Sequence, residues 1–204
     1  MWIVRFLLVA LFASLTATAR AADGGYFIAI GVLNDERGGD YETFLRKVQP
    51  VWERHGMSIV LRVKTRFVLH TKGDPVPDDI TVLRYENRAG FTAYLSDPEY
   101  QSIKALRENA LDYLTIMEAQ AVKMDGLPQL AKTPMALVRL DKERVAGDDP
   151  ALVLMADLVV NVKGSTGFWG VTRQVRFSPL SFDDNPMTGA QGSPVLSLAG
   201  DLVR

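Results

Sequence analysis

Four basic side chains share the even-numbered positions of residues 57–70, and this pattern comes closest to a chemical site. Arg62, Lys64, Arg66 and His70 are even-numbered positions of a predicted strand, whose odd-numbered positions are mainly apolar. Alternate residues of a strand point to opposite faces of a sheet, so the four basic residues are predicted to share one face. Such a face would bind a small anion. The alternative is that these residues form cross-strand ion pairs or meet solvent.

Further charged residues lie on neighbouring predicted elements. Arg84 lies on a strand over residues 80–86, and Glu118 lies on a strand over residues 114–122. Arg107 lies on the apolar stripe of a helix, where it either reaches an anion at the sheet edge or pairs with a nearby glutamate. The candidate ligand-binding residues are therefore Arg62, Lys64, Arg66, His70, Arg84, Arg107 and Glu118. A small acidic ligand is the predicted partner.

Other site chemistries find little support in the sequence. The chain has no cysteine, which excludes disulfides and thiolate catalysis, and its two histidines, His55 and His70, are too few for a multi-histidine metal site. His55 at the end of a helix is explained by the helix dipole rather than by haem binding. No nucleophile elbow, phosphate loop, dinucleotide fingerprint or zinc spacing is present. We expect no metal and no cofactor, and the sequence favours binding over catalysis without deciding against an enzyme.

The elements that position these residues begin with a clear helix start at Asp97-Pro98-Glu99-Tyr100. Asp97 is a capping residue, Pro98 suits the first helical position, and Glu99 favours the positive end of the helix dipole. Upstream, residues 26–33 predict a strand, and a helix follows from an Asp40 cap to His55-Gly56, with a kink expected at Pro50.

Residues 57–70 and 80–86 predict two strands, residues 91–95 a helical turn, and residues 114–122 the last strand of this half. The order is β-α-β-β-α-β. It predicts an α+β fold, a ferredoxin-like sandwich with both helices on one face of an antiparallel sheet.

This half resembles the domain-of-unknown-function 1330 family of the dimeric α/β-barrel superfamily. Tyr26-Phe27-Ile28, the Tyr41 helix ending at His55-Gly56, and Asp97-Pro98-Glu99-Tyr100 followed by Arg107 carry the resemblance over residues 25–122. The resemblance implies a homodimer whose two sheets face each other around a pocket, which the charged strand face would then line. The family brings no established reaction. Some members of the wider superfamily are cofactor-free or haem-dependent oxygenases, which is the alternative function.

The rest of the chain is predicted to be a linker over residues 123–134 and a mainly β region over residues 135–204. Strands are expected at residues 135–141, 152–163, 168–177 and 195–203, separated by turns rich in glycine and proline. Gly170-Val171-Thr172-Arg173-Gln174-Val175 and residues 198–204 resemble strands of the YceI-like, lipocalin-like, polyisoprenoid-binding family. This resemblance implies part of a lipocalin-like barrel and an isoprenoid-like ligand.

The N-terminus reads as a Sec signal peptide over residues 1–21. Arg5 precedes the apolar run 6–15, and small residues at Ala17, Ala19 and Ala21 fit a cleavage site. The apolar run is shorter than the roughly 20 residues of a membrane span, so no stable span is expected after cleavage. Removal of Arg5 and Arg20 leaves 21 basic and 24 acidic residues, a formal charge of −3. We therefore expect a periplasmic or secreted bacterial protein that does not bind nucleic acid.

Overall fold

A computed structural model describes residues 24–71, 73, 75–143, 150, 152–164, 172–180 and 196–203 of the 204-residue chain. The predicted signal peptide lies outside the described residues, as do residues 168–171 and 195 of the two last predicted strands. The predicted domain boundaries at residues 25–122, 123–134 and 135–204 stay predictions.

The elements of the first half agree closely with those expected from the sequence. They are β1 (Gly25–Leu33), α2 (Gly39–Arg54), β2 (Met57–Thr71), β3 (Asp79–Tyr85), α3 (Arg88–Leu95), α4 (Pro98–Ala110) and β4 (Leu111–Lys123). Two details differ. Gly38 rather than Asp40 is the N-cap of α2, without a side-chain hydrogen bond, and the helix assignment continues through Pro50.

The second half is mainly β, as predicted. The short helix α5 (Leu127–Leu130) is followed by β5 (Met135–Asp141), β6 (Leu152–Lys163), β7 (Gln174–Leu180) and β8 (Leu196–Leu202). The strands predicted at residues 135–141 and 152–163 are confirmed. The valine-rich composition of β6 is typical of a strand and agrees with this assignment.

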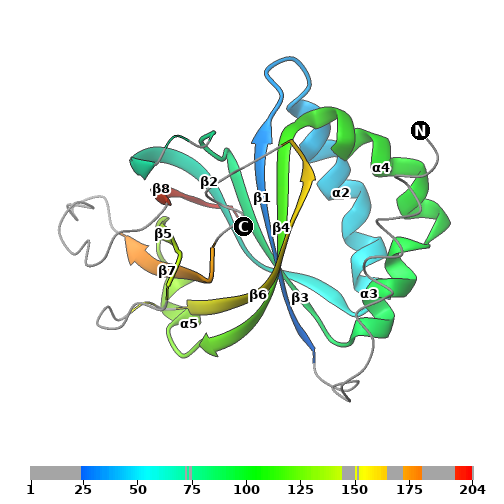
Figure 1. Ribbon diagram of the computed structural model, residues 1–204. Helices are drawn as coiled ribbons and strands as arrows, with labels where there is room; N and C mark the ends of the chain where they lie inside the picture. Colours follow the sequence, from blue (N-terminus) through cyan, green and yellow to red (C-terminus); the bar gives the residue numbers. More distant parts are fainter. Residues whose placement is uncertain are drawn as a thin grey trace.

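The predicted fold class is wrong at the level of architecture. All eight strands form one closed antiparallel barrel in the order β1-β3-β2-β8-β5-β7-β6-β4, so the first half is not a separate ferredoxin-like sandwich. The edges of its sheet are paired within the same chain: β2 pairs with β8, and β4 pairs with β6. Figure 1 shows this closure, with the helices α2, α3 and α4 beside the barrel. The homodimer stays a prediction.

The barrel interior is an apolar core to which all eight strands contribute. Ile28, Val63, Ile80, Met117 and Phe177 are among its side chains, and each has no exposed surface. An eight-stranded barrel has an interior just wide enough for side chains to fill it. The expected charged lining is therefore wrong, because the basic row of β2 points the other way.

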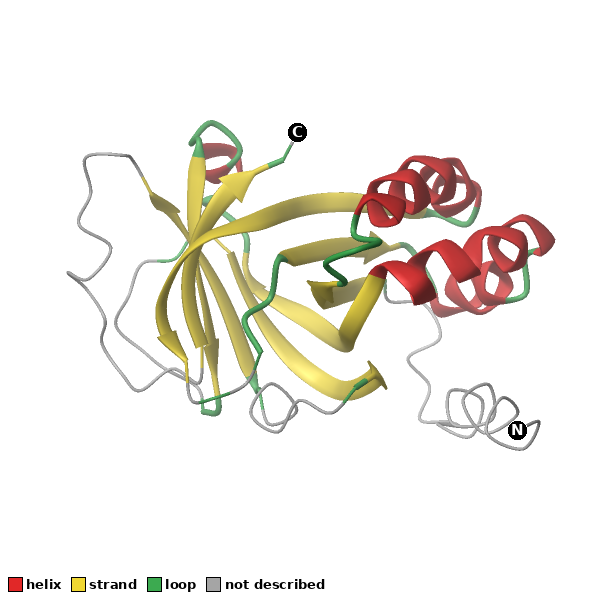
Figure 2. Cartoon of the chain, turned by 90° about the horizontal axis from the view of Figure 1, so that it is seen from above, coloured by secondary structure: helices red, strands yellow, loops and turns green. Residues whose placement is uncertain are grey.

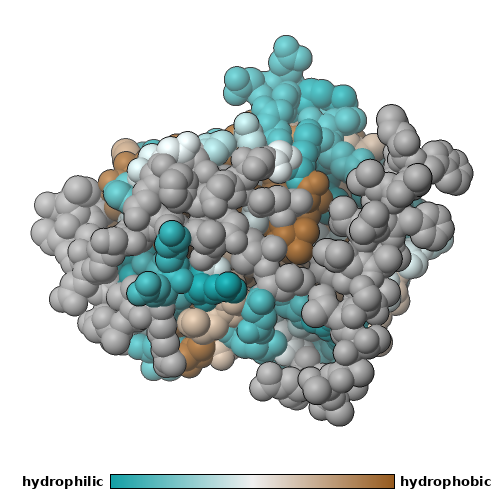
Figure 3. All heavy atoms as spheres, viewed as in Figure 1, coloured by the Kyte–Doolittle hydropathy of each residue, from teal (hydrophilic) through white to brown (hydrophobic). Residues whose placement is uncertain are grey.

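The helices form a second layer against the outer face of the first-half sheet. Their apolar side chains pack on outward-facing residues such as Phe27, Leu83 and Tyr85. Figure 2 shows α2, α3 and α4 gathered on one side of the strands, away from the short helix α5. In the same view as Figure 1, the loop over residues 34–38 forms a hydrophilic tip at the top of the molecule (Figure 3). No helix among the described residues is long and apolar enough to cross a membrane.

Candidate functional site

The helix start predicted at Asp97 is confirmed. The Oδ1 atom of Asp97 accepts hydrogen bonds from the backbone N–H groups of Glu99, at 2.8 Å, and Tyr100, at 3.4 Å. Pro98 occupies the first turn of α4, where a missing N–H has no consequence. The Asp-Pro-Glu-Tyr motif thus fixes the position from which Tyr100 and Arg107 project.

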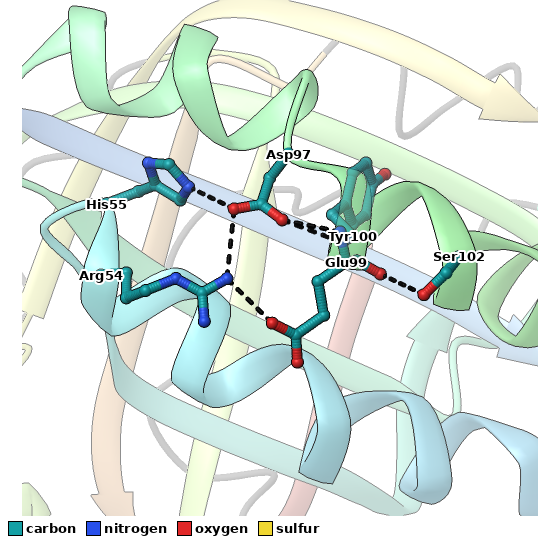
Figure 4. Close-up of polar contacts among 6 residues, drawn as sticks. All are labelled: Arg54, His55, Asp97, Glu99, Tyr100 and Ser102. Carbon is teal, nitrogen blue, oxygen red and sulfur yellow. Dashed lines mark hydrogen bonds and ion pairs between the residues drawn. The ribbon is translucent and has the colours of Figure 1, made fainter.

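The other carboxylate oxygen of Asp97 joins α4 to the end of α2. Asp97 Oδ2 lies 3.1 Å from an Arg54 guanidinium nitrogen and 2.9 Å from His55 Nε2, while Arg54 also contacts Glu99 at 2.9 Å (Figure 4). The hydrogen bond from His55, together with those from Arg54 and the two backbone N–H groups, holds the pKa of Asp97 well below its usual range. Asp97 stays ionised, and it fixes the spacing between α2 and α4. The nitrogen Nε2 of His55 is engaged by this carboxylate.

An aromatic cluster fills the space between these helices. The ring centroids of Tyr94 and Tyr100 are 4.3 Å apart, and Trp52 lies 6.3 Å from Phe44 and 6.5 Å from Tyr94. The guanidinium carbon of Arg107 lies 5.8 Å from the ring centroids of both Phe44 and Tyr100. Aromatic rings of α2 and α4 therefore lie against the guanidinium group of Arg107, an arrangement that favours positive charge.

Two hydrogen-bond donors in this cluster are buried without a partner. They are Nε1 of Trp52, a residue only 5% exposed, and Nε of Arg107. Nε1 of Trp52 interacts with the Tyr94 hydroxyl but lacks the geometry of a hydrogen bond. Among the described residues, Arg107 has no carboxylate partner. A buried unsatisfied donor costs about 1–3 kcal/mol and calls for an explanation such as a bound acceptor.

The tyrosines around Arg107 do not neutralise its charge. Burial raises the pKa of the Tyr94 and Tyr41 hydroxyls well above the ordinary value, and Arg107 only partly opposes this effect. Both phenols are therefore neutral at physiological pH. The cluster keeps one positive charge and two free donors, which suits a carboxylate better than a cation or an apolar molecule.

The basic row of β2 lies against helix α2. Arg62 is 6% exposed and donates from Nε to Asp79 of β3 at 2.6 Å, and from its two terminal nitrogens to Glu42 of α2 at 2.7 and 3.0 Å. Lys64 contacts the same Glu42 at 2.6 Å, and the Thr81 hydroxyl donates to Asp79 at 2.7 Å. These residues form an ion network that joins the helix to the sheet.

This network makes stability depend on pH. The hydrogen bond from Arg62, followed by that from Lys64, lowers the pKa of Glu42 to about 2, so the ionised form stabilises the fold above the ordinary glutamate pKa and is lost as the pH falls. Burial raises the pKa of Asp79, which acts in the opposite direction.

We expect Glu42→Gln to flatten the loss of thermal stability between about pH 6 and about pH 3. An unchanged slope in thermal unfolding would contradict the assignment to Glu42.

The remaining candidate residues are dispersed. Arg66 is exposed and contacts Asp201 at 3.3 Å, and His70 and Arg84 are exposed. Glu118 is buried on the helix side, where it accepts from the Tyr85 hydroxyl at 2.7 Å and pairs with Arg88. A role of these residues in ligand binding stays a prediction. The structure does not bring them together in one site.

Trp52 and Tyr94 were not among the candidates. Both have the residue type and spacing of an apolar helix stripe, and the sequence carries no signal that the indole N–H lacks a partner. Among the described residues there is also no group of three or more histidine or acidic side chains that could hold a metal ion.

The protein is a closed β-barrel in which helices α2, α3 and α4 cover the sheet of the first half. The aromatic cluster around Arg107 lies in this helix layer. Residues 24–120 match the family model described as Domain of unknown function (DUF1330). This match confirms the resemblance to the DUF1330 family over the first half of the chain. The chain has no match among the curated proteins.

Solved structures with a similar fold over all or part of this chain include two that differ in extent. A protein of unknown function from Rhodopseudomonas palustris is 19% identical with a TM-score of 0.50, and the match covers 57% of this chain and 93% of that chain. An anthrone oxidase-like protein is 9% identical with a TM-score of 0.54, and the match covers 92% of this chain and 94% of that chain. At these identities the likeness concerns the fold alone.

Proposed function

We propose that this protein binds a small carboxylic acid in the helix layer between α2, α3 and α4. The observation that carries the proposal is the buried Nε of Arg107, which has no hydrogen-bond partner although two aromatic rings hold its guanidinium group. A carboxylate there would receive a charge-assisted hydrogen bond from Arg107 and a second bond from Trp52 Nε1.

The surroundings support a ligand with an apolar or aromatic body. Buried rings of Phe44 and Tyr100 lie beside Arg107, and that of Tyr94 lies beside Trp52, while a neutral Tyr94 hydroxyl adds a polar contact without repelling an anion. The site differs from the predicted pocket inside the barrel, yet it takes the same class of ligand and uses one of the same residues, Arg107.

The variant Trp52→Phe tests the proposal, because it removes the unpartnered N–H and keeps an aromatic ring. We expect affinity for the best-binding acid of a small carboxylate panel to fall about 5- to 10-fold, or about 1–1.4 kcal/mol, which is close to the net contribution of one hydrogen bond. Without ligand, the loss of an unsatisfied donor should stabilise the variant, and this gain opposes the packing contacts that the smaller phenyl ring loses. Calorimetric titration and thermal unfolding measure the two effects.

The control for this titration is Arg66→Met, which removes an exposed arginine on β2. It should leave affinity unchanged, because Arg66 is exposed and contacts Asp201 of β8 rather than the aromatic cluster. If the wild type binds no acid in the panel, the two free donors are satisfied by water and the proposed function is wrong. Equal affinities for the wild type and Trp52→Phe would remove Trp52 from the site.

We further propose that binding takes place outside the cytoplasm, on the basis of the Arg5 and residue 6–15 pattern and the small residues at 17–21. Protein recovered from the periplasm or the medium should begin near Ala22 when its N-terminus is sequenced. Soluble cytoplasmic protein that retains Met1 would contradict this proposal.

A further inference from the structure

The end of β2 is paired on one side only. Residues 57–64 pair with β3, whereas residues 63–71 pair with β8. One further backbone hydrogen bond on the β3 side runs from the N–H of Thr65 to the carbonyl of Asp78. Within the described part of the chain, the strand partner of residues 67–70 is β8 alone. These residues therefore form an open strand edge, although β2 as a whole belongs to a closed barrel.

Two prolines explain why β3 stops short of this edge. Pro75 and Pro77 lie just before β3, and proline has no backbone N–H to donate to a neighbouring strand. The N–H of Asp78, the next residue, donates to the carbonyl of Gly31 on β1, on the opposite side from β2. A longer pairing of β2 with β3 is thereby disfavoured, and the edge stays open to another strand.

Apolar side chains are exposed at the same edge. Phe67 is 52% exposed and Val68 is 41% exposed, and Val76, between the two prolines, is 37% exposed. Successive residues of a strand point to opposite faces, so both faces of this strand end reach the surface. These three are half of the six large apolar side chains that are exposed in the described ranges. The surface thus combines apolar area with an open edge, the two features that an added strand covers.

The charge of this segment is entirely basic. Residues 64–72 contain two lysines, one arginine and one histidine, and no acidic residue. Two of the basic residues already have carboxylate partners from elsewhere in the chain, because Lys64 contacts Glu42 at 2.6 Å and Arg66 contacts Asp201 at 3.3 Å. This surface therefore accepts carboxylates, and an acidic strand would meet it with opposite charge.

Other occupants fit the edge less well. A second copy of the same edge would bring basic side chains opposite basic side chains, which disfavours pairing of two such strands. A lipid bilayer would cover Phe67 and Val68, but its hydrocarbon region has no groups that hydrogen-bond to a strand edge. An acidic peptide segment satisfies the backbone, the apolar side chains and the charge together.

We propose that residues 67–70 of β2 bind an extended segment of a partner protein, which is added to the sheet as a strand and carries acidic and apolar residues in alternation. Backbone hydrogen bonds to the open edge supply affinity, and the alternating side chains supply specificity. Apolar side chains of the segment pack on Phe67 and Val68, and its carboxylates lie beside His70. This site shares no residue with the carboxylate site of the helix layer, so each can be tested without the other.

The probe is a capped, fluorescently labelled hexapeptide of alternating glutamate and valine, titrated against the full-length protein. We expect saturable binding in fluorescence anisotropy, together with slower amide hydrogen exchange in residues 67–70. A lysine–valine hexapeptide should not bind, because its charge is that of the edge. A glutamate–valine peptide whose two central residues are replaced by proline should not bind either, because it lacks the backbone donors of a strand. Lack of saturable binding by the first peptide, or equal binding by the proline peptide, would overturn the proposal.

Phe67→Ala should lower the affinity for the glutamate–valine peptide about tenfold, since it removes the largest exposed apolar contact. Val122→Ala is the matched control, because Val122 on β4 is likewise 52% exposed, and it should leave the affinity unchanged. His70→Glu should weaken binding of the glutamate–valine peptide about fivefold and strengthen that of the lysine–valine peptide. Thermal unfolding checks that each variant is folded.

The two other occupants give distinct results in the same assays. Binding to phosphatidylglycerol vesicles that depends on Phe67, without binding of the peptide, would make the edge a membrane-contact surface and would refute the inference. A dimer of the wild type that Phe67→Ala abolishes in native mass spectrometry would assign the edge to a second copy and would refute it as well.

Discussion

Arg107→Met is expected to lower the affinity for small carboxylic acids by about 10- to 100-fold while leaving the fold intact. A charge-assisted hydrogen bond contributes roughly 1.5–3 kcal/mol, and the substitution removes both the charge and the buried Nε donor. The methionine side chain can keep the contacts with the rings of Phe44 and Tyr100. Because Arg107 has no ion pair among the described residues, its loss should change the free energy of unfolding by less than about 1 kcal/mol.

Arg107→Lys separates the role of charge from that of geometry. Lysine keeps the positive charge but has no planar guanidinium group and no Nε donor at this depth. We expect it to restore only part of the lost affinity, as measured by calorimetry beside wild type and Arg66→Met. Full recovery would mean that charge alone attracts the acid. A variant Arg107→Met that binds like the wild type would end the proposal that this cluster is the site.

The individual elements were predictable because their signals are local. The Asp97 cap, Pro98 and the apolar stripe of α4 all lie within one short stretch, and the strands 135–141 and 152–163 are marked by composition and flanking turns. Closure of the barrel depends on pairings between distant residues. Arg66 and Asp201, which meet across β2 and β8, are 135 positions apart, and no local pattern specifies such a partner.

The site prediction failed for a related reason. Alternation along β2 correctly separates Arg62 from Leu61 and Val63, but it does not say which row faces the helices. Both faces of this sheet are covered, one by α2 and one by the second half of the chain, so burial alone cannot distinguish them. Register shifts between Thr65 and Phe67 and between Val68 and His70 then break the regular alternation that would have kept Arg66 and His70 in line.

Burial of Arg62 on the helix side leads to the largest expected effect on stability. Its guanidinium group is held by Asp79 and Glu42, and the side chain of Asp79 is only 2% exposed. Arg62→Met would leave Asp79 buried with the Thr81 hydroxyl but without a cation. Removal of one partner of a buried ion pair costs about 3–5 kcal/mol, because the charge of the other partner is no longer compensated. We therefore expect chemical denaturation at neutral pH to show that the free energy of unfolding falls by this amount.

The pH dependence and a double variant distinguish this mechanism from simple loss of packing. Burial already raises the pKa of Asp79, and without Arg62 the carboxyl group should take up a proton more readily still, so the destabilisation should shrink as the pH falls. Arg62→Met combined with Asp79→Asn removes the uncompensated charge and should recover a substantial part of the loss at neutral pH. Arg66→Met, which removes an exposed arginine of the same strand, should change stability by only about 0.5 kcal/mol. If the losses from Arg62→Met and Asp79→Asn simply add, the two residues do not interact as the geometry indicates.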